Sequence, residues 1–152
     1  MNKTAAFSLL AGALANFAIA VLHILIIFNG PEWYLWFGAG ERMANLAARH
    51  SPVPVLLTLG VTIIFIIMGL YGLSGCRMIK KLPLLRTGLI TIAAIYTLRG
   101  MGVLPMLWWY IKNPQYYPFR FVIFSLVALV IGIFYTIGIV AVWKTKQKGK
   151  IR

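Results

Sequence analysis

Long runs of apolar residues dominate this sequence, and each is long enough to cross a lipid bilayer. They cover residues 5–28, 53–73, 87–110 and 121–143. A hydrocarbon core about 30 Å thick requires about 20 residues of helix. Only helices and closed barrels satisfy backbone polar groups in lipid, and continuous runs of this length are typical of helices. We therefore expect an all-α integral membrane protein whose four transmembrane helices form a bundle.

The composition favours one membrane domain. The chain has 152 residues, of which 61% are hydrophobic and 11% are charged. Such a chain has apolar length for several spans and little left over for a soluble part. The run at 5–28 is longer than the apolar region of a signal peptide, which is about 7–15 residues, so we interpret it as a retained span. We expect a single domain over residues 1–152 that ends in a basic tail at 144–152.

The basic residues are sorted between the two sides of the membrane. Ten of the 15 Lys and Arg residues lie before the first run, between the second and third runs, or in the tail, whereas four lie in the other two loops. Because loops rich in Lys and Arg stay in the cytoplasm, both termini are expected there. The expected location is the bacterial inner membrane. The net charge of +13 suits anionic lipid headgroups, and no nucleic-acid recognition motif accompanies it.

The loop between the first and second runs is too apolar to be an ordinary solvated loop. Residues 29–52 include Trp33, Trp36 and Met43, which favour partial burial. Glycines near residue 40 permit a bend. We expect an aromatic turn followed by a short helix over about residues 40–49, which either lies on the membrane surface as an amphipathic helix or re-enters the membrane.

Two faces of this short helix carry polar residues. Glu41 and Asn45 are four residues apart and share one face, while Arg42 and Arg49 are seven apart and share another. In one arrangement Glu41 turns inward while the arginines reach lipid headgroups. In the alternative, a surface helix keeps all these charges in water.

Arg99 is a cation inside the third apolar run. An arginine at the centre of a membrane helix costs about 2.5–3.5 kcal/mol, so it normally faces the bundle interior, an aqueous cavity or a partner. The chain has two acidic residues, and we expect Glu41 to be the counter-ion, with Glu32 as second choice. Alternatively, Arg99 extends outward to lipid phosphates if its helix ends near Pro105.

Further polar residues accompany Arg99 in the predicted spans. Tyr96 lies one turn before Arg99, and His23 lies five residues before the end of the first run. A histidine there either handles a proton or makes an ordinary hydrogen bond between helices. The candidate ligand-binding residues are Arg99, Glu41, His23, Asn45 and Tyr96.

The sequence offers no recognisable metal or cofactor chemistry. The chain has a single cysteine, Cys76, and no HExxH or clustered Cys/His spacing. A serine-based triad lacks a local histidine, and no glycine-rich phosphate loop occurs. We therefore assign no catalytic residue, no metal and no cofactor.

The expected function is that of a small polytopic membrane protein with an outward-facing polar pocket. This pocket would bind or transport a small anionic solute or a lipid headgroup, and a homo-oligomer would supply an aqueous route between protomers. One alternative is a membrane-embedded, lipid-modifying enzyme that uses Glu41 and His23 as acid and base. Another is a non-catalytic accessory or assembly subunit in which Arg99 pairs with a helix of a partner protein.

Overall fold

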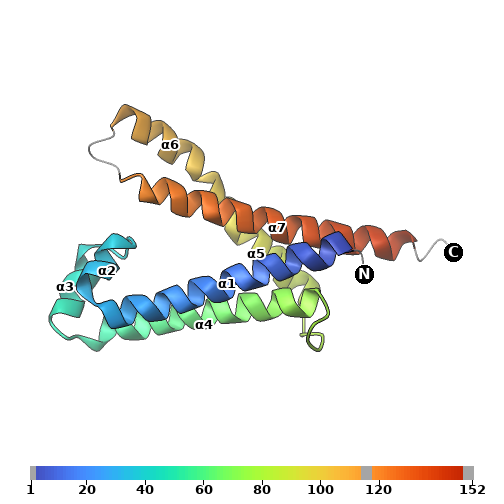
Figure 1. Ribbon diagram of the computed structural model, residues 1–152, viewed down its shortest axis with the longest axis horizontal. Helices are drawn as coiled ribbons and strands as arrows, with labels where there is room; N and C mark the ends of the chain where they lie inside the picture. The colour runs from blue at the N-terminus through green and yellow to red at the C-terminus, as the bar shows by residue number, and fades with distance from the viewer. Residues whose placement is uncertain (1–2, 114–117, 149–152) are drawn as a thin grey trace. The chain divides into compact units, whose positions relative to one another are not determined.

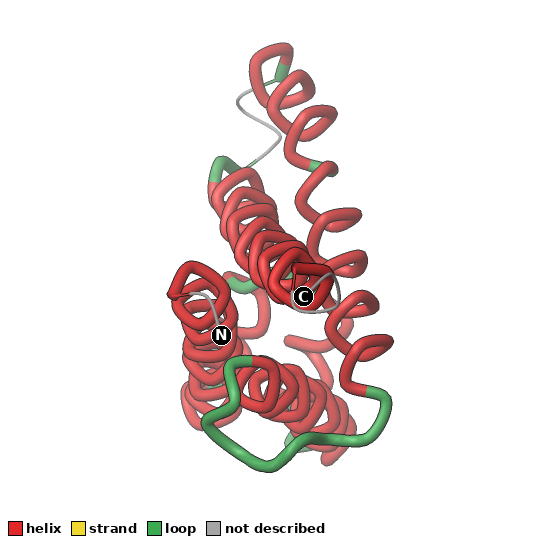
Figure 2. The backbone as a smooth tube through the Cα atoms, turned by 90° about the vertical axis from the view of Figure 1, so that its right-hand side faces the viewer, coloured by secondary structure: helices red, strands yellow, loops and turns green. Residues whose placement is uncertain are grey.

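The structure, a computed structural model, describes the backbone of residues 3–113 and 118–148, with side chains as far as residue 142. These residues form helices joined by short loops, and no strand occurs among them (Figure 2). The side chains of the basic tail, 144–152, lie outside the described residues. The helices, labelled in Figure 1, are α1 (Lys3–Asn29), α2 (Pro31–Trp36), α3 (Glu41–Ala48), α4 (Pro52–Gly75), α5 (Leu85–Met101), α6 (Val103–Lys112) and α7 (Arg120–Lys148).

Four helical segments are long and apolar enough to cross a membrane. In the most apolar 18-residue stretch of each segment, only 22% to 44% of the residues are buried within the protein. Exposed apolar surface of this extent is typical of helices that face lipid rather than water. The prediction of an all-α fold with four candidate spans is therefore confirmed. The segments are Lys3–Asn29, Pro52–Gly75, Leu85–Lys112 and Arg120–Val142.

The third candidate span is broken at Gly102, between α5 and α6. Pro105 explains the break, because a proline has no N–H to donate to the carbonyl four residues earlier and its ring clashes with that carbonyl. The residue four before Pro105 is Met101, the last residue of α5. The chain tightens there, since the Gly102 N–H donates to the Arg99 carbonyl at 3.3 Å.

The helices belong to two compact units. Unit 1 comprises residues 1–14 and 70–152, and unit 2 comprises residues 15–69. Unit 1 therefore contains the start of α1, the end of α4, and α5, α6 and α7. Unit 2 contains the rest of α1, α2 and α3, and most of α4.

In unit 1, α5 and α7 pack so closely that their backbones touch. A Cβ atom on Gly100 of α5 would lie 2.5 Å from the Cα atom of Leu129 in α7. A Cβ atom on Gly132 of α7 would lie 2.9 Å from the backbone nitrogen of Thr97 in α5. Small residues at such contacts let membrane helices approach closely, so that van der Waals packing holds them together.

Tyr135 of α7 belongs to the buried core of unit 1. Its side chain is fully buried, with 0% exposure. The ring contacts Gly12 of α1, its hydroxyl group reaches Gly72 of α4, and it lies parallel to the ring of Tyr96 with centroids 6.5 Å apart. One side chain thus connects parts of α1, α4, α5 and α7.

The basic loop between α4 and α5 is held against the end of α4. The Ser74 hydroxyl donates to the Lys80 carbonyl at 3.1 Å and accepts from the Leu82 N–H at 2.9 Å. The Tyr71 hydroxyl donates to the Pro83 carbonyl at 3.0 Å. These bonds give the loop a fixed conformation, in which the side chains of Lys80 and Lys81 are exposed.

In unit 2, α2 and α3 form a helical hairpin at the C-terminal end of α1. Tyr34 of α2 and Ala44 of α3 form a buried apolar cluster with Ile26 of α1. The Thr58 hydroxyl of α4 donates to the Tyr34 hydroxyl at 3.4 Å, which joins the hairpin to α4.

The prediction of an aromatic turn before residue 40 was wrong, because this segment forms the helix α2. Pro31 occupies the first turn, where the missing N–H costs nothing and the fixed φ angle favours a helix. Gly30, with a φ angle of 78°, turns the chain between α1 and α2. The helix expected over about residues 40–49 is present as α3, Glu41–Ala48.

Each helix of the hairpin ends at a residue in the left-handed conformation. This residue is Gly38 after α2, with φ 84°, and His50 after α3, with φ 55°. After α3, the Ser51 N–H donates to the Leu46 carbonyl at 3.0 Å, as in a Schellman motif. These bonds define where α3 ends.

Candidate functional site

The exposed face of α3 carries its polar residues. Ala44 belongs to the buried cluster with Ile26 and Tyr34, and Met43 and Ala47 pack against that cluster. Because a helix turns about 100° per residue, this burial leaves the remaining positions on the outside. Glu41 and Asn45 are both exposed, so α3 does not bury their shared face within its unit.

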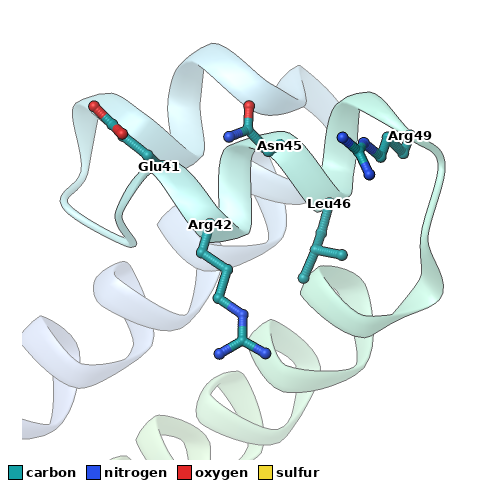
Figure 3. A pocket seen from close by; sticks show the side chains of 5 residues that line it. All are labelled: Glu41, Arg42, Asn45, Leu46 and Arg49. Atoms are coloured by element: carbon teal, nitrogen blue, oxygen red, sulfur yellow. The ribbon is translucent and has the colours of Figure 1, made fainter.

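A shallow hollow of about 400 Å³ lies on this exposed face. It is lined by Glu41, Arg42, Asn45, Leu46 and Arg49 (Figure 3). Leu46 lies between the two arginines, and the Glu41 carboxylate points away from the Arg42 guanidinium (Figure 3). Among residues 3–113 and 118–142, no hydrogen bond or ion pair engages the guanidinium group of either arginine. The hollow therefore presents two guanidinium groups whose donors are available to a ligand.

The α3 hollow brings together two of the five predicted site residues, Glu41 and Asn45. Arg42 and Arg49 line the same hollow but were not among the predicted site residues. Their spacing of seven was visible in the sequence, where it was assigned to general contact with headgroups. What the spacing did not reveal is that both faces border one hollow.

His23 lies in the same unit as α3, but its ring is already engaged. The Nδ1 atom lies 2.8 Å from the Ile19 carbonyl oxygen of the preceding helical turn. The ring also packs against Phe65 of α4, with centroids 5.0 Å apart. If Nδ1 carries the proton and donates to that carbonyl, Nε2 remains as an acceptor. These contacts are those of a histidine that helps α1 and α4 to pack.

Arg99 and Tyr96 lie in unit 1, on the last two turns of α5. Tyr96 is buried against Tyr135, whereas the Arg99 side chain is exposed. The two residues are close enough for an electrostatic interaction. Because Arg99 and Glu41 belong to different units, their pairing stays a prediction.

The described residues do not group in a way that suggests metal binding. Within residues 3–113 and 118–142, no three His, Cys, Asp or Glu side chains lie together. The chemistry that the α3 hollow does offer is recognition of an anion, through guanidinium groups and the Asn45 amide.

The fold defines an all-helical protein with four helices long and apolar enough to span a membrane. In comparisons with protein-family models, with curated proteins and with solved structures, nothing matches this chain.

Proposed function

We propose that this chain is a small polytopic protein of the bacterial inner membrane that binds an anionic headgroup or a small anionic solute on the exposed face of α3. The observation that carries the proposal is the hollow of about 400 Å³ beside Arg42 and Arg49. The proposed ligand class is the phosphate of an anionic lipid, or a free anion of the same chemistry.

The two arginines suit a phosphate in chemistry and in spacing. Residues seven apart on a helix are separated by about 10 Å along its axis, so both guanidinium groups reach one phosphate-sized group placed between them. A guanidinium binds phosphate through two parallel hydrogen bonds, which a lysine cannot do. Leu46, between the arginines, provides an apolar contact for the carbon atoms beside the phosphate.

The position of α3 supports a ligand at headgroup level. The buried face of α3 packs on Ile26, three residues before α1 ends at Asn29. If α1 spans the membrane, its end lies at the boundary between hydrocarbon and headgroups, and α3 lies there with it. An anionic lipid is therefore the first choice of ligand.

The proposed orientation places α3 on the periplasmic side of the membrane and the loop after α4 in the cytoplasm. We expect an impermeant maleimide to label His50→Cys in intact spheroplasts, in a Cys76→Ser background, because His50 is exposed at the end of α3. Lys80→Cys in the same background should be labelled only after lysis. The reverse pattern would place both termini outside and refute the proposed orientation.

The anion site is tested by removing its two arginines. Arg42→Ala/Arg49→Ala is expected to weaken binding of dihexanoyl phosphatidylglycerol at least tenfold, because it removes both charge-assisted contacts. Binding is measured as the ligand-dependent rise in melting temperature in maltoside micelles. Lys80→Ala/Lys81→Ala removes the same charge from an exposed loop and should bind like the unmodified protein. Equal losses in the two variants would indicate a general charge effect and contradict the proposal.

A second candidate function is that of an accessory subunit, and α5 and α6 favour it. Arg99 is exposed at the end of α5, and none of the residues of α6 is buried. A cation in an apolar span requires a partner, and a carboxylate on a helix of another protein would provide one. We expect such a membrane-protein partner to co-purify with the unmodified chain. Loss of the partner in Arg99→Ala but not in Arg42→Ala/Arg49→Ala would favour this candidate.

A further inference from the structure

A second hollow lies on α2, and its lining differs from that of the α3 hollow. It has a volume of about 350 Å³ and is lined by Glu32, Trp33, Trp36 and Phe37. Three aromatic rings and one carboxylate make this surface suited to a cation, whereas two guanidinium groups make the α3 hollow suited to an anion.

Helical spacing brings the four side chains together. Glu32 and Trp36 are four residues apart, as are Trp33 and Phe37, so each pair shares a face of α2 and the two faces adjoin. The helix itself creates this combination, because an extended aromatic turn would have placed neighbouring side chains on opposite sides.

The three rings contact one another at inclined angles. The Phe37 ring lies 4.6 Å from the Trp36 ring at an interplanar angle of 71°, and 5.6 Å from the Trp33 ring at 43°. Each face of an aromatic ring carries the negative part of its quadrupole. A ring face that borders the hollow can therefore attract a cation.

Glu32 gives this surface a sign opposite to that of most of the protein. The chain has a net charge of +13 and two acidic residues, and one of them lines this hollow. Within the described residues, no hydrogen bond or ion pair engages the Glu32 carboxylate. Its charge is therefore available to a bound cation.

Two of the rings are held in place by the core of unit 2. Trp33 and Phe37 are partly buried and pack against the cluster of Ile26, Tyr34 and Ala44. Side chains that are already fixed lose little conformational entropy when a ligand binds, so the rings need not rearrange. Trp36 and Glu32 are exposed and accessible to a ligand.

We propose that the hollow formed by Glu32, Trp33, Trp36 and Phe37 binds an organic ammonium group, either free in solution or as part of a lipid headgroup. The rings contact the carbon-bound hydrogens next to the positive nitrogen, and Glu32 balances its charge. This site is independent of the anion site on α3, since the two hollows share no lining residue. A role confined to anchoring the rings at the membrane boundary would give no preference for a positive ligand.

The chain provides its own reporter for the test. Of its five tryptophans, two line the hollow, so a Trp108→Phe/Trp109→Phe/Trp143→Phe protein has fluorescence from Trp33 and Trp36 alone. This protein, in maltoside micelles, is titrated with choline and with 3,3-dimethyl-1-butanol, which has the same shape without the charge. We expect a saturable fluorescence change with choline and at least tenfold weaker binding of the alcohol.

Variants in the same background locate the site. Glu32→Gln and Phe37→Leu are each expected to weaken choline binding at least fivefold, and Leu35→Ala, an exposed α2 residue outside the hollow, is expected to leave it unchanged. Diheptanoyl phosphatidylcholine distinguishes the ligand sources. Tighter binding of this lipid than of choline identifies a headgroup, and equal binding identifies a free ammonium ion. Equal binding of choline and the alcohol, or unchanged binding in Glu32→Gln, would overturn the proposal whatever the Arg42→Ala/Arg49→Ala protein does.

Discussion

Gly100→Ala is expected to destabilise unit 1 by about 3 kcal/mol or more, near the upper end of the usual cost of overpacking a core. The added Cβ atom would lie 2.5 Å from the Cα atom of Leu129 and 2.6 Å from its backbone nitrogen. Backbone atoms cannot rotate away as a side chain does, so α5 and α7 would have to separate. Separation loses van der Waals contact along the helix pair, which is the main force between helices in lipid.

The measurement is the thermal unfolding midpoint in maltoside micelles, followed by circular dichroism. Gly60→Ala in α4 is the matched control, because no atom lies within 4 Å of the position of its Cβ atom. Both substitutions gain about 1 kcal/mol of helix propensity, so the difference between them isolates the contact with Leu129. Equal midpoints for the two variants would show that α5 and α7 do not pack as described.

Tyr135→Ala is expected to destabilise unit 1 by about 3–5 kcal/mol, the usual cost of replacing a large buried aromatic residue with alanine. Tyr135 has 0% exposure and contacts Gly12, Gly72 and the Tyr96 ring. Removing the ring leaves a cavity bordered by glycines, which have no side chains to fill it. The same unfolding midpoint measures the effect.

Tyr135→Phe separates the ring from its hydroxyl group. It keeps the packing against Gly12 and Tyr96 and removes only the hydroxyl group, so it should cost no more than about 1 kcal/mol. If Tyr135→Phe were as unstable as Tyr135→Ala, the hydroxyl rather than the ring would hold the unit together. If neither variant lowered the midpoint, the assignment of Tyr135 to the core would be refuted.

The spans were predictable because they depend on composition within a single segment. The apolar runs at 5–28 and 53–73 lie inside α1 and α4, which extend beyond them by no more than two residues at either end. The interruption of the third span near Pro105 was also visible, since a proline acts on the carbonyl four residues before it.

The helix α2 was not predictable in the same way, because residues outside α2 stabilise it. A segment of six residues is too short to be stable as an isolated helix. It is held by Tyr34, which packs against Ile26 and accepts a hydrogen bond from Thr58. Since α2 is what assembles the aromatic hollow, the sequence alone did not reveal that site.

In the candidate site, too, spacing within one helix was predictable, whereas packing between helices was not. The shared face of Glu41 and Asn45 followed from their spacing, and both line one hollow. That this face is exposed depends on Ala44, which the helix buries against Ile26. The partner of Arg99 depends on packing between helices, which no periodicity within one helix determines.

The packing of Leu9 has a consequence for the biogenesis of the protein. Leu9, near the start of the chain, is fully buried, and a Cβ atom on Gly138 in the last helix would lie 2.5 Å from its Cγ atom. Leu9 and Gly138 are 129 residues apart, so α1 lacks this neighbour until α7 has been synthesised. Contacts between residues far apart in the sequence form slowly and leave intermediates exposed. During that interval, this part of α1 lacks the α7 contact that buries Leu9.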